Sequence, residues 1–125
     1  MQTIASIFII LAILVHIYIW VLESFLWTKP ATIKTFNISN DFAHASKTLA
    51  FNQGFYNLFL AIGAGIGLVL LLTGHIDSGK ALLFSGLGSM VLASFVLIVS
   101  DKTKLRPAFV QFIAPAIALT LLLFV

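Results

Sequence analysis

Four apolar stretches, each long enough to cross a lipid bilayer, constrain this sequence more than any other feature. They cover about residues 3–27, 49–73, 81–100 and 108–125. A membrane-spanning helix needs about 20 predominantly apolar residues. The apolar residues also run on without the alternation, every second residue, that is typical of a membrane-spanning strand. We therefore expect an all-α fold, a single four-transmembrane-helix bundle that occupies residues 1–125.

The composition excludes a water-soluble domain. Hydrophobic residues make up 61% of the chain and charged residues 9%, and the mean hydropathy is +1.14. Soluble domains are about 45–50% apolar and about 25% charged, and a short one buries only about 60–70% of its unfolded surface. Disorder is excluded because the chain has too much to bury and too little charge to stay solvated. With no cysteine, the chain has no disulfide framework and no thiolate metal site.

The loops predict an orientation in the membrane. The first loop, residues 28–48, is expected to start extended at Lys29 and Pro30, and then to form a helix from near Ser39 that can run unbroken into the second span. Basic residues gather in loops one and three, which share a side. By the positive-inside rule these loops are cytoplasmic and both termini extracytoplasmic, in the cell membrane, and the net charge of +3 needs no nucleic-acid partner. The basic residues are Lys29, Lys34, Lys47, Lys102, Lys104 and Arg106, against Lys80 in the second loop.

A few polar side chains lie within the predicted spans. A charged group at the centre of a span costs about 2.5–3.5 kcal/mol, so such groups tend to face protein, a cavity or a partner. His16 and Glu23 are seven residues apart in the first span, which places them on nearly the same stripe of a helix. The others are Asn52, Gln53, Tyr56 and Asn57 in the second span and Gln111 in the fourth.

Depth in the membrane predicts how the first two spans pair. At a rise of 1.5 Å per residue, Glu23 lies about 6 Å and Asn52 about 5 Å below the cytoplasmic surface, while His16 lies about 16 Å and Asn57 about 12 Å below it. We therefore expect one polar pocket in the cytoplasmic half, between the first two spans. Its expected lining is His16, Glu23, Asn52, Gln53, Tyr56 and Asn57.

Structural roles for the same residues stay open. Glu23 can reach the interface or pair with Lys47. His16 can be a neutral imidazole bonded to the next helix, and the amides can hold helices together for about 0.6 kcal/mol each. Pro115 removes a hydrogen bond to the carbonyl of Gln111 and is expected to bend the fourth span. Stripes of small residues favour close helix packing or a homo-oligomer interface: Gly63 with Gly67, and Ser85, Ser89 and Ala93.

Three stretches resemble a known family. They are HIYIWVLESFLW (residues 16–27), FNISNDFAHASKTLA (36–50) and above all NQGFYNLFLA (52–61). The family consists of small bacterial and fungal four-span membrane proteins, catalogued as a domain of unknown function. The resemblance covers essentially the whole chain. It implies the four-span fold and marks the polar residues of the first two spans, but it implies no activity.

A fainter likeness concerns the membrane-associated eicosanoid and glutathione metabolism proteins, which are four-span chains of similar size that assemble as trimers. The stretch from Asn52 to Ala61 is similar to their polar second helix and the apolar segment after it. The chain departs from their pattern, because Lys47 stands where arginine is expected and Asn57 replaces the acidic partner. The likeness therefore implies a shared architecture and not glutathione recognition.

Three kinds of function fit these features. The first is binding or transport of a small polar or amphipathic molecule through the polar pocket. The second is a membrane-embedded enzyme acting on a lipophilic substrate, with Glu23 or His16 as acid or base and Asn52 with Tyr56 holding a substrate oxygen. The third is an accessory subunit of a larger complex. Catalytic residues stay unassigned, and no cofactor is expected. No metal is expected either, because His16 and Glu23 supply two ligands and zinc needs more. The expected partners are the bilayer, a small-molecule or lipid ligand, and further copies of the chain.

Overall fold

The structure is a computed structural model that describes residues 1–125; it is 86% helical and has no strands. Four of its helices are long and apolar enough to cross a membrane, so the expected all-α four-span bundle is confirmed. The elements in chain order are α1 (Gln2–Ser24), α2 (Pro30–Phe36), α3 (Asn40–Ala45), α4 (Lys47–Leu72), α5 (Ile76–Ser100), the 3-10 turn η1 (Lys102–Lys104) and α6 (Leu105–Leu122).

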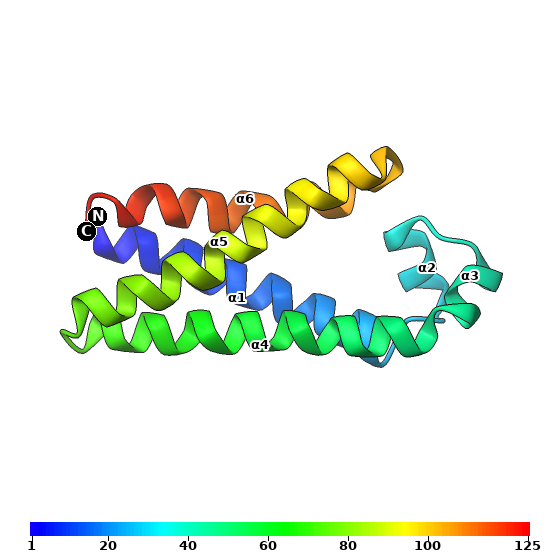
Figure 1. Ribbon diagram of the computed structural model, residues 1–125, viewed down its shortest axis with the longest axis horizontal. Helices are drawn as coiled ribbons and strands as arrows, with labels where there is room; N and C mark the ends of the chain where they lie inside the picture. The colour runs from blue at the N-terminus through cyan, green and yellow to red at the C-terminus, as the bar shows by residue number, and fades with distance from the viewer.

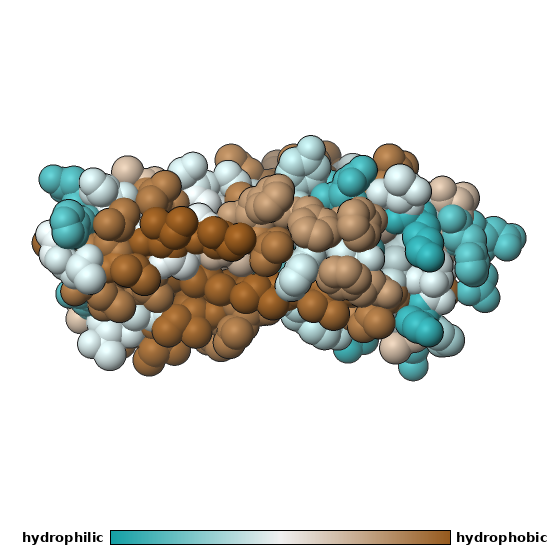
Figure 2. Space-filling view, turned by 90° about the horizontal axis from the view of Figure 1, so that it is seen from below, coloured by the Kyte–Doolittle hydropathy of each residue, from teal (hydrophilic) through white to brown (hydrophobic).

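The four long helices form a ring in which α1 packs on α4, α4 on α5, α5 on α6 and α6 on α1. Both termini and the α4–α5 turn lie at one end of the bundle, and α2 and α3 lie at the other (Figure 1). Large apolar side chains on every long helix are about half exposed or more, such as Leu14, Ile66 and Ile113. Figure 2 shows this apolar surface along the middle of the bundle, with hydrophilic residues at both ends and most of them at the α2–α3 end. This surface is typical of a multi-pass membrane protein.

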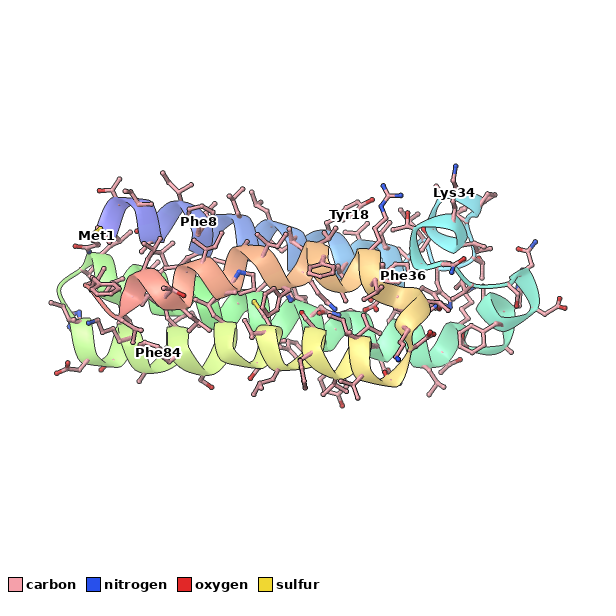
Figure 3. All side chains as sticks on the ribbon, turned by 90° about the horizontal axis from the view of Figure 1, so that it is seen from above. Met1, Phe8, Tyr18, Lys34, Phe36 and Phe84 are labelled. Carbon is pink, nitrogen blue, oxygen red and sulfur yellow. The ribbon has the colours of Figure 1, made fainter.

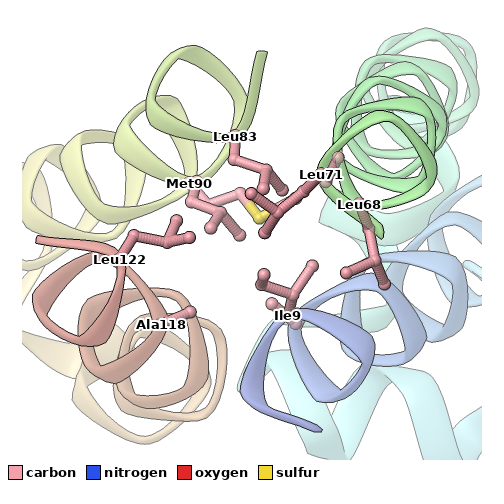
Figure 4. Close-up of a cluster of buried hydrophobic side chains, with 10 residues drawn as sticks. Ile9, Leu68, Leu71, Leu83, Met90, Ala118 and Leu122 are labelled. Carbon is pink, nitrogen blue, oxygen red and sulfur yellow. The ribbon is translucent and has the colours of Figure 1, made fainter. Parts of the chain in front are cut away.

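The half of the bundle near the termini is closed by a core. Side chains from all four long helices meet there (Figure 4). At the α4–α5 contact the backbones touch, because a Cβ built on Gly79 would lie 2.6 Å from the Leu71 nitrogen and 2.9 Å from the Gly67 oxygen. The core consists of Ile9, Ala12, Ala64, Leu68, Leu71, Leu83, Leu87, Met90, Ala118 and Leu122.

The other half of the bundle is open. There α1 and α4 stay in contact at Gly54, where an added Cβ would overlap the Ser24 hydroxyl and lie 3.1 Å from the Glu23 Cβ. Toward the same end α5 diverges from α4 (Figure 1). At the α2 end, α1 and α4 therefore stay together while α5 lies away from α4 (Figure 1).

The first loop differs from expectation just after its start. An extended segment was expected at Lys29 and Pro30; Lys29 is extended, with φ of −79° and ψ of 143°, but α2 already begins at Pro30. Proline fits the first helical position, because its fixed φ suits a helix and its missing N–H would be unpaired there in any case. The short helix ends at Asn37, which adopts the left-handed conformation with φ of 51°. Asparagine tolerates this conformation better than most residues.

The loop helix near Ser39 does not continue into the second span. It is a separate helix, α3, whose start is capped by the Ser39 hydroxyl accepting from the Phe42 N–H at 3.2 Å. The chain leaves helical geometry at Ser46, with φ of −96° and ψ of 4°. There the Ser46 hydroxyl donates to the Phe42 carbonyl at 2.6 Å and accepts from the Trp27 indole N–H at 3.1 Å. These hydrogen bonds hold the chain in the non-helical conformation that separates α3 from α4.

Two span ends differ from the predicted ones, and the small-residue stripes pack closely only in part. The first span ends at Ser24, three residues earlier than predicted. The third begins at Ile76, five residues earlier than predicted, because the turn between α4 and α5 is short and reverses the chain at Gly74, whose φ is 88°. Gly67 lies at the α4–α5 contact, but a Cβ on Gly63 would meet nothing within 4 Å. The second stripe, Ser85, Ser89 and Ala93, is exposed.

Candidate functional site

A cavity of about 1020 Å³ occupies the open half of the bundle. It lies beside α1 and α2, with walls that also come from α4, α5 and α6; Tyr18, Lys34 and Phe36, labelled in Figure 3, belong to its lining. Its polar lining includes Glu23, Gln53, Asn57, Gln111, Lys34, Lys104 and Arg106, and its apolar lining includes Leu22, Trp27, Val96, Leu97 and Val110.

A carboxylate–amide pair forms part of the cavity wall. The Asn57 side-chain amide donates to Glu23 Oε2 at 2.9 Å and to the Gln53 carbonyl at 3.3 Å. Asn57 is buried, and Glu23 lies in the last turn of α1. Gly54, one turn before Asn57, brings the two backbones close enough for this bond. The pair therefore joins α1 to α4 where the bundle opens.

A second, smaller groove of about 520 Å³ is bounded by α3 and the start of α4. Asn52 and Tyr56 line this groove and not the larger cavity. Glu23 and Gln53 line both. The side chain of Tyr56 is 63% exposed, so its hydroxyl lies at an open surface.

The structure thus divides the predicted site residues between two hollows and leaves His16 out of both. His16 is buried, and its Nδ1 donates to the Ala12 carbonyl at 2.9 Å within α1. Glu23 lies level with Gly54, two residues from Asn52, but its hydrogen bond goes to Asn57. His16, which was expected level with Asn57, bonds only to Ala12 within α1. That a ligand binds these residues stays a prediction.

Several residues that line the cavity or hold its walls together were not predicted as part of the site. Gly54 was treated only as part of a family stretch, although a glycine beside polar residues of a span signals a close helix contact. Lys34, Lys104 and Arg106 were used only to orient the loops, yet all three line the cavity. Gln111 was noted as polar but not placed at the site. No group of three or more His, Asp or Glu side chains comes together, and we assign no residues to a metal.

Lys104 fastens α2 beside the cavity. Its ammonium donates to the carbonyls of Phe36 at 2.8 Å and Asn37 at 2.6 Å, and it lies 3.9 Å from the carboxylate of Asp101. A cation at the carbonyl end of a helix also interacts favourably with the helix dipole. Hydrogen bonds from the Thr103 hydroxyl and N–H lower the pKa of Asp101, which keeps its carboxylate charged beside Lys104.

The variant Lys104→Met is expected to loosen α2. Two charge-assisted hydrogen bonds are lost, so amide hydrogen exchange in α2 is expected to rise about tenfold or more in the folded protein. Lys102→Met is the matched control, because Lys102 is an exposed lysine of the same turn that lines neither hollow. Equal exchange rates in the two variants would show that Lys104 does not hold α2.

The comparisons with known proteins give a family and no activity. Residues 10–123 match the family described as "Protein of unknown function (DUF1304)". No curated protein matches the chain, and neither does any solved structure. The fainter likeness to the membrane-associated eicosanoid and glutathione metabolism proteins therefore has no support.

Proposed function

Since the chain belongs to this family of unknown function and is a multi-pass membrane protein, we propose from its geometry that it binds a small amphipathic molecule in the 1020 Å³ cavity. Such binding is the first step of either sensing or transport. The observation that carries the proposal is the Glu23–Asn57 pair in the wall of a cavity whose other walls are largely apolar.

The size and the lining of the cavity support this proposal. Ligand sites are typically hollows of about 300–1,000 Å³ with mostly apolar walls and a few polar groups that fix orientation. Polar groups within a membrane are expensive, and they mark binding and transport sites more often than lipid-facing surface. Glu23 keeps acceptor capacity beyond its bond to Asn57, because a carboxylate has two oxygens and about four lone-pair sites.

The position of Tyr56 favours binding over catalysis. The enzyme hypothesis requires its hydroxyl in an internal cleft with Asn52, but both residues line the smaller groove and both are exposed. This groove has about half the volume of the cavity beside Asn57, so it encloses a substrate less completely.

We further propose that the cavity end faces the cytoplasm, because it carries the basic residues of loops one and three. A homo-oligomer is also kept as a proposal. The exposed residues Ser85 and Ser89 on α5 offer a surface where a second copy can approach closely. Native mass measurement after detergent extraction tests the number of copies.

Blocking the cavity is expected to abolish binding. Ala93 lines the cavity on α5, so Ala93→Trp places an indole inside it. The probes are decyl phosphate, decyl glucoside and decyltrimethylammonium, titrated by calorimetry into the protein in phosphatidylcholine nanodiscs, with empty nanodiscs subtracted. The tightest-binding probe is expected to lose about tenfold or more in affinity, or at least about 1.4 kcal/mol.

The matched control is Ala81→Trp, which makes the same change at an exposed position of α5 outside both hollows. It is expected to leave binding unchanged. The proposed function fails if no probe binds in a saturable way, or if the two tryptophan variants lose affinity equally.

A further inference from the structure

Resting on the proposed function and naming its ligand class, we infer that the cavity binds a single-chain anionic amphiphile. Its phosphate or carboxylate group lies by Arg106 and Lys34, and its hydrocarbon chain lies along the apolar wall. The inference stands on three observations: the charges that line the cavity, the bonds that those charges already make, and the exposed apolar side chains of its wall.

The charges in the cavity lining favour an anion. Three cationic side chains line it, Lys34, Lys104 and Arg106, against the single carboxylate of Glu23. Lys34 lies in the last turn of α2 and Arg106 in the first turn of α6, so cations reach the cavity from two separate elements. An arginine guanidinium with a nearby ammonium is a typical receptor for phosphate or carboxylate, because the guanidinium fork matches these groups in a bidentate way.

The existing bonds show which of these cations are free. Lys104 is already held by the carbonyls of Phe36 and Asn37 and by its ion pair with Asp101. Arg106 and Lys34 take part in no ion pair of the structure, so their charge stays available to a ligand. Lys104 therefore positions α2, which carries Lys34, while Arg106 and Lys34 themselves contact the acidic group.

The apolar wall indicates that the ligand has a hydrocarbon chain. Twelve of the 22 lining residues are hydrophobic, so a free anion would leave most of the wall without a partner. Val96 on α5 and Val110 on α6 line the cavity and are 61% and 52% exposed. A chain lying against these valines can enter sideways from the bilayer while its headgroup stays at the polar end.

The Glu23 carboxylate limits the charge of the headgroup and the hydrogen bonds that it can make. Its bond to Asn57 fixes it at the wall, and its remaining lone pairs can accept a hydrogen bond from a hydroxyl or a protonated oxygen of the headgroup. A headgroup with two negative charges would be repelled by the Glu23 carboxylate more strongly than a headgroup with one. The favoured headgroup therefore carries a single negative charge and a hydrogen-bond donor, as an alkyl phosphate does below its second pKa of about 6.

The test uses the double variant Lys34→Gln/Arg106→Gln, and the control Lys29→Gln/Lys102→Gln, which removes two charges from the same loops at residues lining neither hollow. The nanodiscs contain only phosphatidylcholine, so no anionic lipid competes. Wild-type protein is expected to bind decyl phosphate about tenfold or more tighter than decyl glucoside. The double variant is expected to lose about tenfold or more in affinity for decyl phosphate and none for decyl glucoside, while the control loses neither.

Each other outcome overturns a different claim. Equal affinities for decyl glucoside and decyl phosphate, or equal losses in the two double variants, overturn the anionic headgroup while leaving the proposed function standing. Displacement of decyl phosphate by inorganic phosphate at similar concentrations overturns the hydrocarbon chain. Absence of saturable binding for all the decyl probes overturns both the inference and the proposed function.

Discussion

Gly79→Leu is expected to destabilise the bundle by about 3 kcal/mol or more, at or beyond the upper end of the usual cost of overpacking. The first added carbon would lie 2.6 Å from the backbone nitrogen of Leu71 and 2.9 Å from the carbonyl oxygen of Gly67. Backbone atoms of a helix cannot rotate away as the end of a side chain can, so α4 and α5 must separate. The core next to this contact, including Leu83, then loses its packing.

The measurement is the free energy of unfolding in mixed detergent micelles, and the matched control is Gly88→Leu on the same helix. A Cβ on Gly88 meets nothing within 4 Å, and leucine favours a helix over glycine by roughly 0.5–1 kcal/mol. The control is therefore expected to be neutral or slightly more stable. Similar stabilities for the two variants would show that the backbones of α4 and α5 do not touch at Gly79.

Asn57→Leu is expected to cost about 1–3 kcal/mol, because it leaves the Glu23 carboxylate in the cavity wall without its hydrogen-bond donor. The matched control is Asn52→Leu, which removes an amide from an exposed position of α4. This control is expected to change the stability by no more than about 0.5 kcal/mol, as most surface substitutions do. Equal losses in the two variants would indicate that the bond to Glu23 contributes nothing.

A double-mutant cycle separates the bond from its surroundings. Adding Glu23→Leu to Asn57→Leu removes both partners, and such a replacement by apolar groups is often nearly neutral. The double variant is therefore expected to recover most of the stability that Asn57→Leu loses. If the two losses simply add, the residues do not interact, and the pair cannot join α1 to α4.

The four spans could be predicted because the length of an apolar stretch is a property of one segment alone. The order of polar residues along each span was equally visible. Which side chains bond between the two spans was not visible, because the bond from Asn57 to Glu23 depends on the close approach of α1 and α4 at Gly54. His16 shares a stripe with Glu23 but lies about two turns away along α1, where the bundle is already packed.

The cationic part of the cavity escaped prediction for a related reason. Lys34 reaches the cavity because Pro30 starts a helix where an extended segment was expected, and because Lys104 bonds to the end of that helix. The second contact joins residues 68 positions apart in the chain. Local sequence patterns carry no signal for such a contact, so the basic residues of the two loops could not be assembled into a site from the sequence.

The central claim is that a cavity lies at the α2 end of the bundle, with walls from α1, α4, α5 and α6. The most direct test introduces single cysteines, because the chain has none of its own. Gln111→Cys places a single thiol in the cavity lining, and Ile113→Cys places one on the same helix at a position that is 52% exposed but lines neither hollow. The measurement is the rate at which a charged, membrane-impermeant methanethiosulfonate modifies each thiol in phosphatidylcholine nanodiscs. The account predicts fast modification of Gln111→Cys, slowed by decyl phosphate, and slow modification of Ile113→Cys. Equally slow modification of both thiols would contradict it.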